Sequence, residues 1–576
     1  MTDYPLVKQL PCANVVRIVG SENSLCPNAA SSVCKGCFLV QYCSRECQVA
    51  HWSSHKSDCK SPLTKKTWKP SWEVEKRLPS FITTNGPPIG MIPYGAEKYL
   101  WGNVPAFDVL DHKRNEGVDL PEDLHLLFAA SGDIRNVVKS LSGLPELYGG
   151  ECGIVINDRD FDIVARNAIL LLTALHFEPS EATHIMLHIW YSALIPERVF
   201  RSLQDQILPL IHNVCAKIRG RPLTSLQSKT WTYGTRSLRL VLQRAMWDRL
   251  PSYLMVPDDL SIVQAREVMV STTLAPERKD YLERALYTRP PSWRVCNTKF
   301  RKDGVLLPFG SSRRDFDTPN PTFYQAKGVW PMKDSADPLE GWPIEEVIQK
   351  APLAKHDIYG SLFMYIQDIL LAFCRQIGRH KAFFELFHVD ALELPDMVKQ
   401  RSTATMFFDR IEVSNIGDRG YLGPQATLST FGPLLKRKSQ NPHATLLTLF
   451  LNAIQEVSSP IDQVSSFKSE MDQLSKYLPA SPAIIQNSDT NSADFLRHND
   501  ARFLFRDFDK LFQRFHLECH FEEIGKAAGL KVKPNNTIVE PWPMRLKKNA
   551  TQDEFNNLLA SGHNGSERYV EWESLT

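Results

Sequence analysis

The sequence has no long run of apolar residues. Its best candidate for a membrane span, residues 168–177, is short and is flanked by Arg166 and Glu178. A transmembrane helix needs about 20 apolar residues, so we expect no membrane association. The first residues also lack a basic segment followed by an apolar one, which argues against secretion.

Charge of one sign is also missing. The chain of 576 residues carries 67 Lys and Arg against 65 Asp and Glu, a formal net charge of +2. This balance gives no electrostatic reason to expect a nucleic-acid partner. Seven of the 12 cysteines lie within the first 59 residues and the others are scattered singly, which argues against a disulfide framework. We therefore expect a reducing compartment, cytoplasmic or nuclear.

The amino-terminal end is dense in zinc ligands. So short a stretch cannot bury a core that offsets its chain entropy, so a metal is expected to hold it together. Zinc takes four Cys or His ligands at tetrahedral corners, so eight ligands predict two Zn²⁺ ions. With both sites filled, no position is left for an activated water, which favours a structural role. The eight residues are Cys12, Cys26, Cys34, Cys37, Cys43, Cys47, His55 and Cys59.

The interleaved order of these ligands favours a cross-braced arrangement of two sites. The segment with the last six ligands, residues 34–59 (CKGCFLVQYCSRECQVAHWSSHKSDC), resembles a MYND-type zinc finger nearly position for position. The family spacing selects His55 over His51. The match departs from the family at its start, because thirteen residues separate Cys12 from Cys26 where most such fingers have two. We expect the first ion on Cys12, Cys26, Cys43 and Cys47, and the second on Cys34, Cys37, His55 and Cys59.

The resemblance also implies a use, because MYND fingers commonly bind short proline-containing peptides. Gln48 and Trp52 stand at the positions that form much of the peptide-binding surface in the resembled modules. Residues 44–55 are expected to form a short helix, on which positions four apart share a face. An indole beside an amide can stack on a proline ring and bond the peptide backbone. The alternative is that Trp52 packs beneath the finger as its small core.

Residues 61–105 are rich in Pro, Lys and Trp and predict a linker or strap without lasting regular structure. Lys65, Lys66, Lys69, Trp68 and Trp72 could be offered as a nucleic-acid patch, but their pattern favours a solvated linker.

Beyond the linker, strands and helices alternate in the manner of a doubly wound α/β fold. We expect residues 106–178 and 381–457 to form the two parts of this sheet domain, and residues 179–380 to be a mainly helical insertion. Residues 458–499 predict a mobile polar loop, and residues 500–576 a helix and tail packed on the body. Strands are predicted at 124–130, 153–156, 383–389, 409–414 and 444–451.

Residues 100–108, 126–141 and 154–172 resemble the amino-terminal domain shared by cytoplasmic axonemal dynein assembly factors and a group of fungal MYND-containing proteins. Residues 408–423 and 441–453 resemble the second domain of that family. This resemblance implies a non-catalytic or uncharacterised cytosolic factor that binds other proteins. The first function we expect is therefore a zinc-binding interaction scaffold or assembly factor.

The body is also similar to a class I methyltransferase, which gives the alternative of an S-adenosylmethionine-dependent enzyme. That similarity would place Gly132 and Asp133 beside the methionine part of the cofactor, Asp158 at the ribose and Asp390 at the adenine. The loop AASGDIR has a single glycine where cofactor loops usually need two or three, which favours a fold without cofactor. In that case Asp133 and Arg135 are expected to pair.

Overall fold

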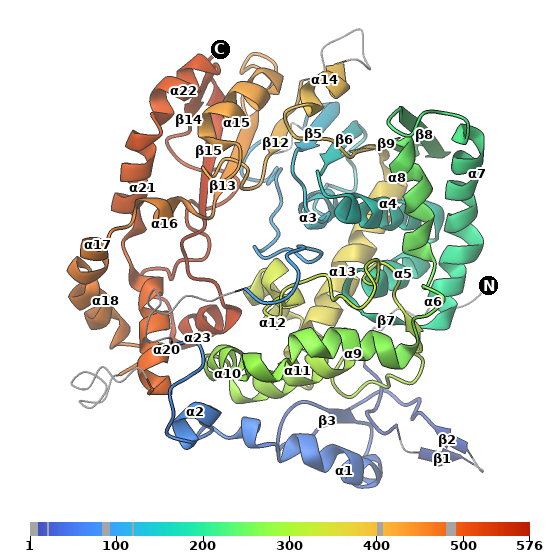
Figure 1. Ribbon diagram of the computed structural model, residues 1–576, viewed down its shortest axis with the longest axis vertical. Helices are drawn as coiled ribbons and strands as arrows, with labels where there is room; N and C mark the ends of the chain where they lie inside the picture. Colours follow the sequence, from blue (N-terminus) through green and yellow to red (C-terminus); the bar gives the residue numbers. More distant parts are fainter. Residues whose placement is uncertain are drawn as a thin grey trace.

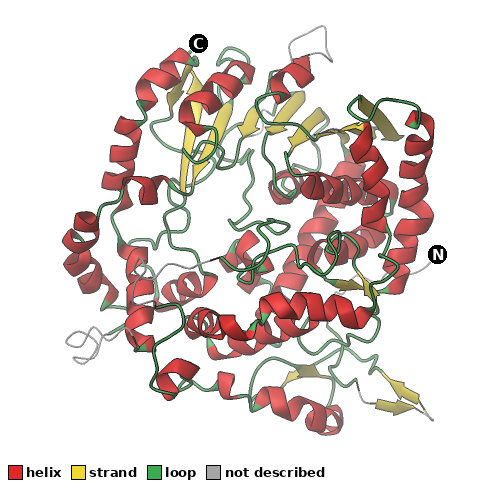
Figure 2. Ribbon diagram, viewed as in Figure 1, coloured by secondary structure: helices red, strands yellow, loops and turns green. Residues whose placement is uncertain are grey.

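A nine-stranded mixed sheet forms the framework of the body (Figure 1, Figure 2). The computed structural model describes residues 10–15, 17–19, 22–82, 93–117, 120–399, 407–479 and 491–576. The mixed α/β character expected from the sequence is confirmed. In spatial order the strands are β14 (Leu530–Val532), β15 (Arg568–Ser574), β13 (Thr445–Phe450), β12 (Arg410–Glu412), β5 (Asp123–Phe128), β6 (Glu151–Asn157), β11 (Lys381–Phe387), β9 (Arg236–Gln243) and β8 (Leu226–Tyr233).

The six strands from β13 to β9 are parallel, and antiparallel strands are added at both sides. β15 lies antiparallel between β13 and β14, so the carboxyl-terminal tail is part of the sheet. From β5 the chain proceeds to β6 and β11 on one side, and later to β12 and β13 on the other. The strand order therefore reverses between β5 and β12, which is where open α/β sheets have a crevice at their carboxyl edge.

Helices cover both faces of this sheet. Leu126 of β5 belongs to one core, together with α3 (Arg135–Ser142), α4 (Phe161–His176) and α13 (Ile358–Arg379). The next residue, Leu127, belongs to a second core with α15 (Gly423–Phe431), α16 (Ala453–Val457) and α21 (Phe508–Glu518). Successive strand residues point to opposite faces, so a strand buried on both sides reads as a continuous apolar run.

The predicted strands are present, but residues 179–380 are not only helical. Besides α5 (Pro179–Tyr191), α7 (Leu208–Ile218), α10 (Lys279–Tyr287) and α11 (Pro291–Asp303), this insertion contains β8 and β9. They form a hairpin through Gly234, whose φ is +63°, and β9 extends the sheet beyond β11. The polar alternation of β8 follows from its edge position, since only one of its faces is covered.

The tail is also more divided than the single helix expected at residues 500–576. Its helices are the end of α20 (Ala493–Arg502), α21, α22 (Phe521–Ala527) and α23 (Gln552–Ser561). Asp507 starts α21 by accepting the N–H of Asp509, and His520 ends it with a left-handed φ of 52°. Residues 458–499, predicted to be a mobile polar loop, form α17 (Pro460–Ser465), α18 (Phe467–Leu474) and the start of α20 where the structure describes them.

Residues 61–82 form a strap that is docked on the insertion and the tail rather than a solvated linker. The Trp72 side chain is fully buried, and Ser71 donates through its N–H and hydroxyl to Glu283 of α10. Lys69 pairs with Asp494 of α20 at 2.7 Å. Trp68, Lys69 and Trp72 are thus used inside the molecule, whereas Lys65 and Lys66 are exposed. No helix among the described residues is long and apolar enough to cross a membrane.

Candidate functional site

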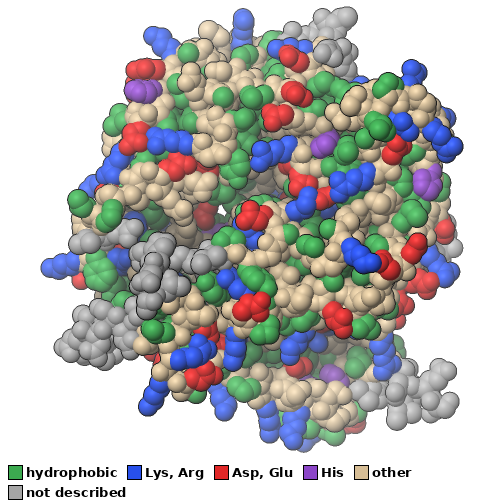
Figure 3. Space-filling view, in the orientation of Figure 1, with side chains coloured by type: hydrophobic (Ala, Val, Ile, Leu, Met, Phe, Trp, Pro, Cys, Tyr) green, Lys and Arg blue, Asp and Glu red, His purple; other side chains and the backbone are tan. Residues whose placement is uncertain are grey.

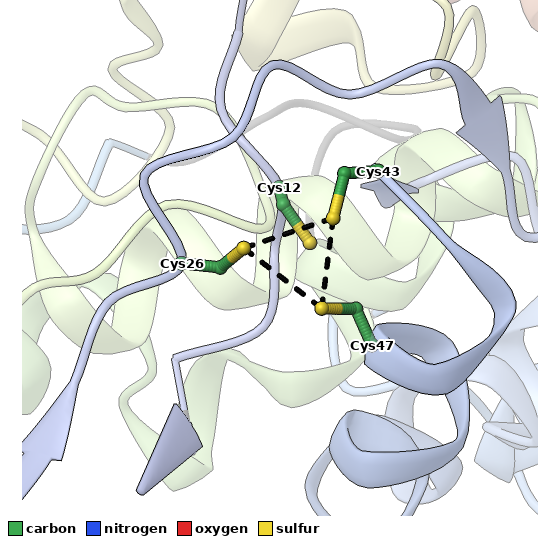
Figure 4. A group of neighbouring side chains, drawn as sticks. All are labelled: Cys12, Cys26, Cys43 and Cys47. Carbon is green, nitrogen blue, oxygen red and sulfur yellow. Dashed lines mark hydrogen bonds between the residues drawn. The ribbon is translucent and has the colours of Figure 1, made fainter. Parts of the chain in front are cut away.

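Four sulfur atoms converge at the amino-terminal end of the molecule (Figure 4). Those of Cys12, Cys26, Cys43 and Cys47 all lie within 4.8 Å of one another. The separations among Cys26, Cys43 and Cys47 are 3.6 to 3.8 Å. Four thiolates at about 2.3 Å from one zinc ion stand about 3.8 Å apart at the corners of a tetrahedron. The first cluster therefore has the dimensions of a four-cysteine zinc site.

The second cluster brings together Cys34, Cys37, His55 and Cys59. The sulfurs of Cys34 and Cys59 lie 3.8 Å apart, and the Cys37 sulfur is 3.3 Å from His55 Nε2. The competing histidine, His51, is buried outside the cluster with its Nδ1 3.1 Å from the Tyr42 hydroxyl. The two clusters fit two structural zinc ions, in the cross-braced arrangement expected from the order of the ligands.

Local structure explains how each ligand is placed. β3 (Ser32–Val33) and β4 (Gln41–Tyr42) form a hairpin that holds Cys34, Cys37 and Cys43, while α1 (Arg45–Cys59) carries Cys47, His55 and Cys59. Ser44 starts α1 by accepting the N–H of Cys47. In the turn between Cys34 and Cys37, a Cβ at Gly36 would lie 3.1 Å from the Cys59 sulfur, so this turn favours glycine.

Burial of these ligands sets their protonation. The pKa of Cys12 is raised to about 12 and that of Cys37 still higher, in both cases mainly because burial disfavours the thiolate. Burial, with a smaller contribution from His51, lowers the pKa of His55 to about 4, so its imidazole is neutral near pH 7, the form that binds metal. Four neighbouring thiolates can be kept ionised in such a site by the charge of a zinc ion.

The finger is docked on the helical insertion. The Cys37 carbonyl accepts hydrogen bonds from Ser292 of α11 and from His356 Nδ1, each at 3.3 Å. The Ala354 N–H donates to Gln41 Oε1. Leu39, Val40 and Tyr42 are buried in the same core as the insertion. The metal clusters thus fix one side of the finger against the body, and α1 lies on the outside (Figure 1).

The proposed peptide-binding residues lie on this outer helix. Gln48 is half-buried, Trp52 is 36% exposed and Val49 is 66% exposed. The Trp52 indole meets the His55 ring at its edge, and Lys60 Nζ lies 6.0 Å from the indole centre. Trp52 is therefore available at the surface and is not the core of the finger.

The residues assigned to S-adenosylmethionine at the carboxyl edge of the sheet are bonded within the chain. Asp133 Oδ1 accepts from Arg135 Nε at 2.6 Å, the pairing expected in the absence of a cofactor. Asp158 accepts the N–H groups of Gly132 and Asp160 at 2.9 and 2.8 Å. Asp390 is exposed and accepts the N–H of Leu392. The four residues assigned to S-adenosylmethionine are thus brought to one edge, but the chain itself uses their bonding groups.

Arg135 also fills the space beside the β5–α3 turn. Its guanidinium donates to the carbonyls of Val104 and Gly341, and a Cβ at Gly102 would lie 1.3 Å from its Nη2. Gly102 in turn donates its N–H to Asp133. The donor and acceptor groups at this turn are therefore satisfied by protein, and they do not fit S-adenosylmethionine.

Glu412 is a residue of this edge that sequence reasoning missed. It ends β12 beside the point where the strand order reverses, is 5% exposed and accepts the N–H of Ser414. Burial raises the pKa of its carboxyl to about 7. A strand was predicted at 409–414, but the burial of Glu412 within it depends on distant segments that no local pattern reports.

Glu412→Gln is expected to be more stable than the parent protein, by a margin that increases with pH. The Glu412 carboxyl has a higher pKa in the folded protein than in the unfolded chain. As the pH rises between these two pKa values, the unfolded chain loses the proton while the folded protein keeps it, so the parent protein becomes less stable up to a pH of about 7. Between pH 6 and pH 8 the margin should increase by about 1 kcal/mol. Urea unfolding at both pH values measures it. A margin that stays constant would contradict the buried, neutral carboxyl.

Two family models match the chain, one over the finger and one over part of the body. Residues 23–59 match the model for the MYND finger, and residues 100–195 match a domain of unknown function (DUF4470). No curated protein and no solved structure matches the chain. The matches name no dynein assembly factor, so that resemblance gains no support. Cys12 lies outside the matched finger, although the structure places its sulfur in the first cluster.

Proposed function

We propose that this protein is a cytoplasmic or nuclear interaction scaffold whose MYND finger binds proline-containing segments of a partner. The observation that carries the proposal is the exposed outer face of α1, with Trp52 and Val49 uncovered while the opposite side of the finger is packed on the insertion. A finger held in this way presents a fixed surface to a partner, so little ordering is required at the moment of binding.

The chemistry of this face suggests what the partner segment contains. The Trp52 ring supplies a flat surface for a proline ring, and the Gln48 amide can bond an extended backbone. Lys56 and Lys60 are exposed beside it. An acidic residue next to the proline would therefore improve binding.

Trp52→Ala is expected to weaken binding of a proline-containing partner peptide by at least tenfold while the zinc content stays at two. The loss follows from removal of the largest exposed ring on the contact face. Fluorescence polarisation with an acidic, proline-containing peptide and elemental analysis measure the two quantities. Gln48→Ala should weaken binding in the same way, and Val263→Ala, which removes an exposed side chain on α9 (Ile262–Thr273), is the control. Loss of metal in Trp52→Ala would show a structural role instead.

We further propose that the body is a methyltransferase-like sheet that serves as an assembly platform. Without the β8–β9 hairpin, the seven strands follow the chain in the spatial order 6-7-5-4-1-2-3, with the last strand antiparallel. This order supports the methyltransferase-like class and is the observation that favours the second candidate, an S-adenosylmethionine-dependent methyltransferase. The occupied groups around Asp133 and Asp158 favour the non-catalytic role.

A further inference from the structure

A ring of aromatic and cationic side chains surrounds the carboxyl edge of the sheet, separate from the finger. Arg159 follows β6, Tyr421 lies in the loop between β12 and α15, and Tyr99 and Lys333 come from two segments that cover this edge. The Arg159 guanidinium lies 5.8 Å from the Tyr421 ring centre. Lys333 Nζ lies 5.1 Å from the Tyr99 ring centre and donates to the Tyr99 hydroxyl at 3.0 Å. Lys98, beside Tyr99, pairs with Asp160, beside Arg159, at 2.9 Å, which brings these segments together.

The ring spans the point where the strand order reverses. β6 and β12 are the two neighbours of β5, so the contact between Arg159 and Tyr421 passes over the end of β5 and its turn at Gly132. Gly132 has a φ of +55°, and a Cβ placed on it would meet no atom within 4 Å. The position beside Gly132 is thus open, whereas Arg135 fills the Gly102 side of the turn. Figure 3 shows a hollow near the middle of the view, with side chains of both charge signs around it.

The two cations of the ring have no carboxylate partner within ion-pair distance among the residues described. Most charged side chains near them are paired: Lys98 with Asp160 and Asp162, and Arg249 with Asp162. Arg159 and Lys333 form no such pair, and instead lie over tyrosine rings that are 48% and 44% exposed. The Arg159 guanidinium, the Lys333 ammonium and the Tyr421 hydroxyl thus offer donors around this mouth, while the Tyr99 hydroxyl already accepts from Lys333.

We propose that this mouth binds a phosphate-bearing nucleotide. Arg159 and Lys333 would hold the phosphate, since both groups bind phosphate oxygens, and an exposed tyrosine ring would stack on the base. The site lies at the carboxyl edge of parallel strands, where small molecules bind in open α/β sheets. It selects for negative charge, and so differs from a site for S-adenosylmethionine, whose sulfonium is positive.

Titration calorimetry of the full-length, zinc-loaded protein with AMP tests the proposal. We expect AMP to bind, adenosine and inorganic phosphate to bind more weakly, and S-adenosylmethionine to give no heat. Arg159→Gln and Lys333→Gln should each weaken AMP binding about tenfold, the usual effect of losing one charge-assisted hydrogen bond, and the double variant should weaken it about a hundredfold. Lys217→Gln, which changes an exposed lysine on α7, is the matched control.

Three results would overturn the nucleotide site: no heat with AMP at millimolar concentration, unchanged AMP affinity in the double variant, or adenosine binding as tightly as AMP. Both charged side chains are at the surface or half-buried, so the variants are expected to fold, and an unchanged thermal midpoint verifies it. Tyr421→Leu is an independent test. It should weaken the binding of AMP more than the binding of inorganic phosphate, because only the nucleotide has a base that can stack on the tyrosine ring.

Discussion

Chelation of the zinc-loaded protein is expected to release two metal ions and to expose the part of the insertion that the finger covers. The finger has little core of its own, and its buried residues Leu39, Val40 and Tyr42 belong to a core shared with the body. In zinc-finger peptides the metal contributes on the order of 10 kcal/mol, which is folding free energy. Loss of the metal should therefore unfold the finger and release its docking contacts.

Hydrogen exchange locates this effect. Ser292 and His356 bond the Cys37 carbonyl, inside the second metal site, so exchange in α11 and around residue 356 should increase together with that of α1. Exchange in β5 and β6, far inside the sheet, should change little.

Single substitutions separate the two ions. Cys12→Ser should lower the zinc content from two to one, as should Cys34→Ser in the other cluster. Cys215→Ser, which changes a half-buried cysteine of α7 outside both clusters, is the control that should keep two ions. A parent protein that carries one zinc or fewer would contradict the paired sites and the recognition role given to the finger.

Glu116→Ala is expected to lower the free energy of unfolding by about 3–5 kcal/mol, the usual result of removing one partner from a buried ion pair. Glu116 Oε1 accepts from Arg410 Nη2 at 2.6 Å, and the two side chains are 2% and 0% exposed. The remaining guanidinium would bond four backbone carbonyls but keep an uncompensated charge in the interior.

Urea unfolding with matched variants measures this loss. Glu197→Ala, which breaks an exposed pair with Arg201 on α6 (Glu197–Ser202), should produce no measurable change. The double variant Glu116→Leu with Arg410→Met should recover part of the stability, because no buried charge is left unpaired. A single variant as stable as the parent would show that the carbonyls alone compensate Arg410.

The sequence predicted the features that depend on residues close together in the chain, namely the metal ligands and most of the parallel strands. The short spacings of Cys34, Cys37, Cys43 and Cys47 fix tight turns that supply tetrahedral corners, so the metal ligands could be assigned before any fold was considered. Five of the six parallel strands were found in the same way, as apolar runs, but β9 was not.

Where a structure depends on distant partners, the sequence predicted less. The polar strand β8 carries no strong local signal, and its place in the sheet comes from pairing with β9. The sequence of residues 61–82 predicts a solvated linker, because the contacts that dock this strap are made with the distant residues Glu283 and Asp494. The same holds for Asp133 and Asp158, whose position at the strand ends was predicted but whose bonding partners were not.

The sequence by itself thus determined the two metal clusters, the α/β class and the carboxyl ends of the main strands. Only the tertiary structure decided which side of the finger is free, which carboxylates are already bonded, and which cations lie unpaired at the edge of the sheet. The physical reason is range: ligand spacing and apolar periodicity act within a few residues, whereas burial, ion pairing and docking depend on groups hundreds of residues apart that meet only when the chain is folded.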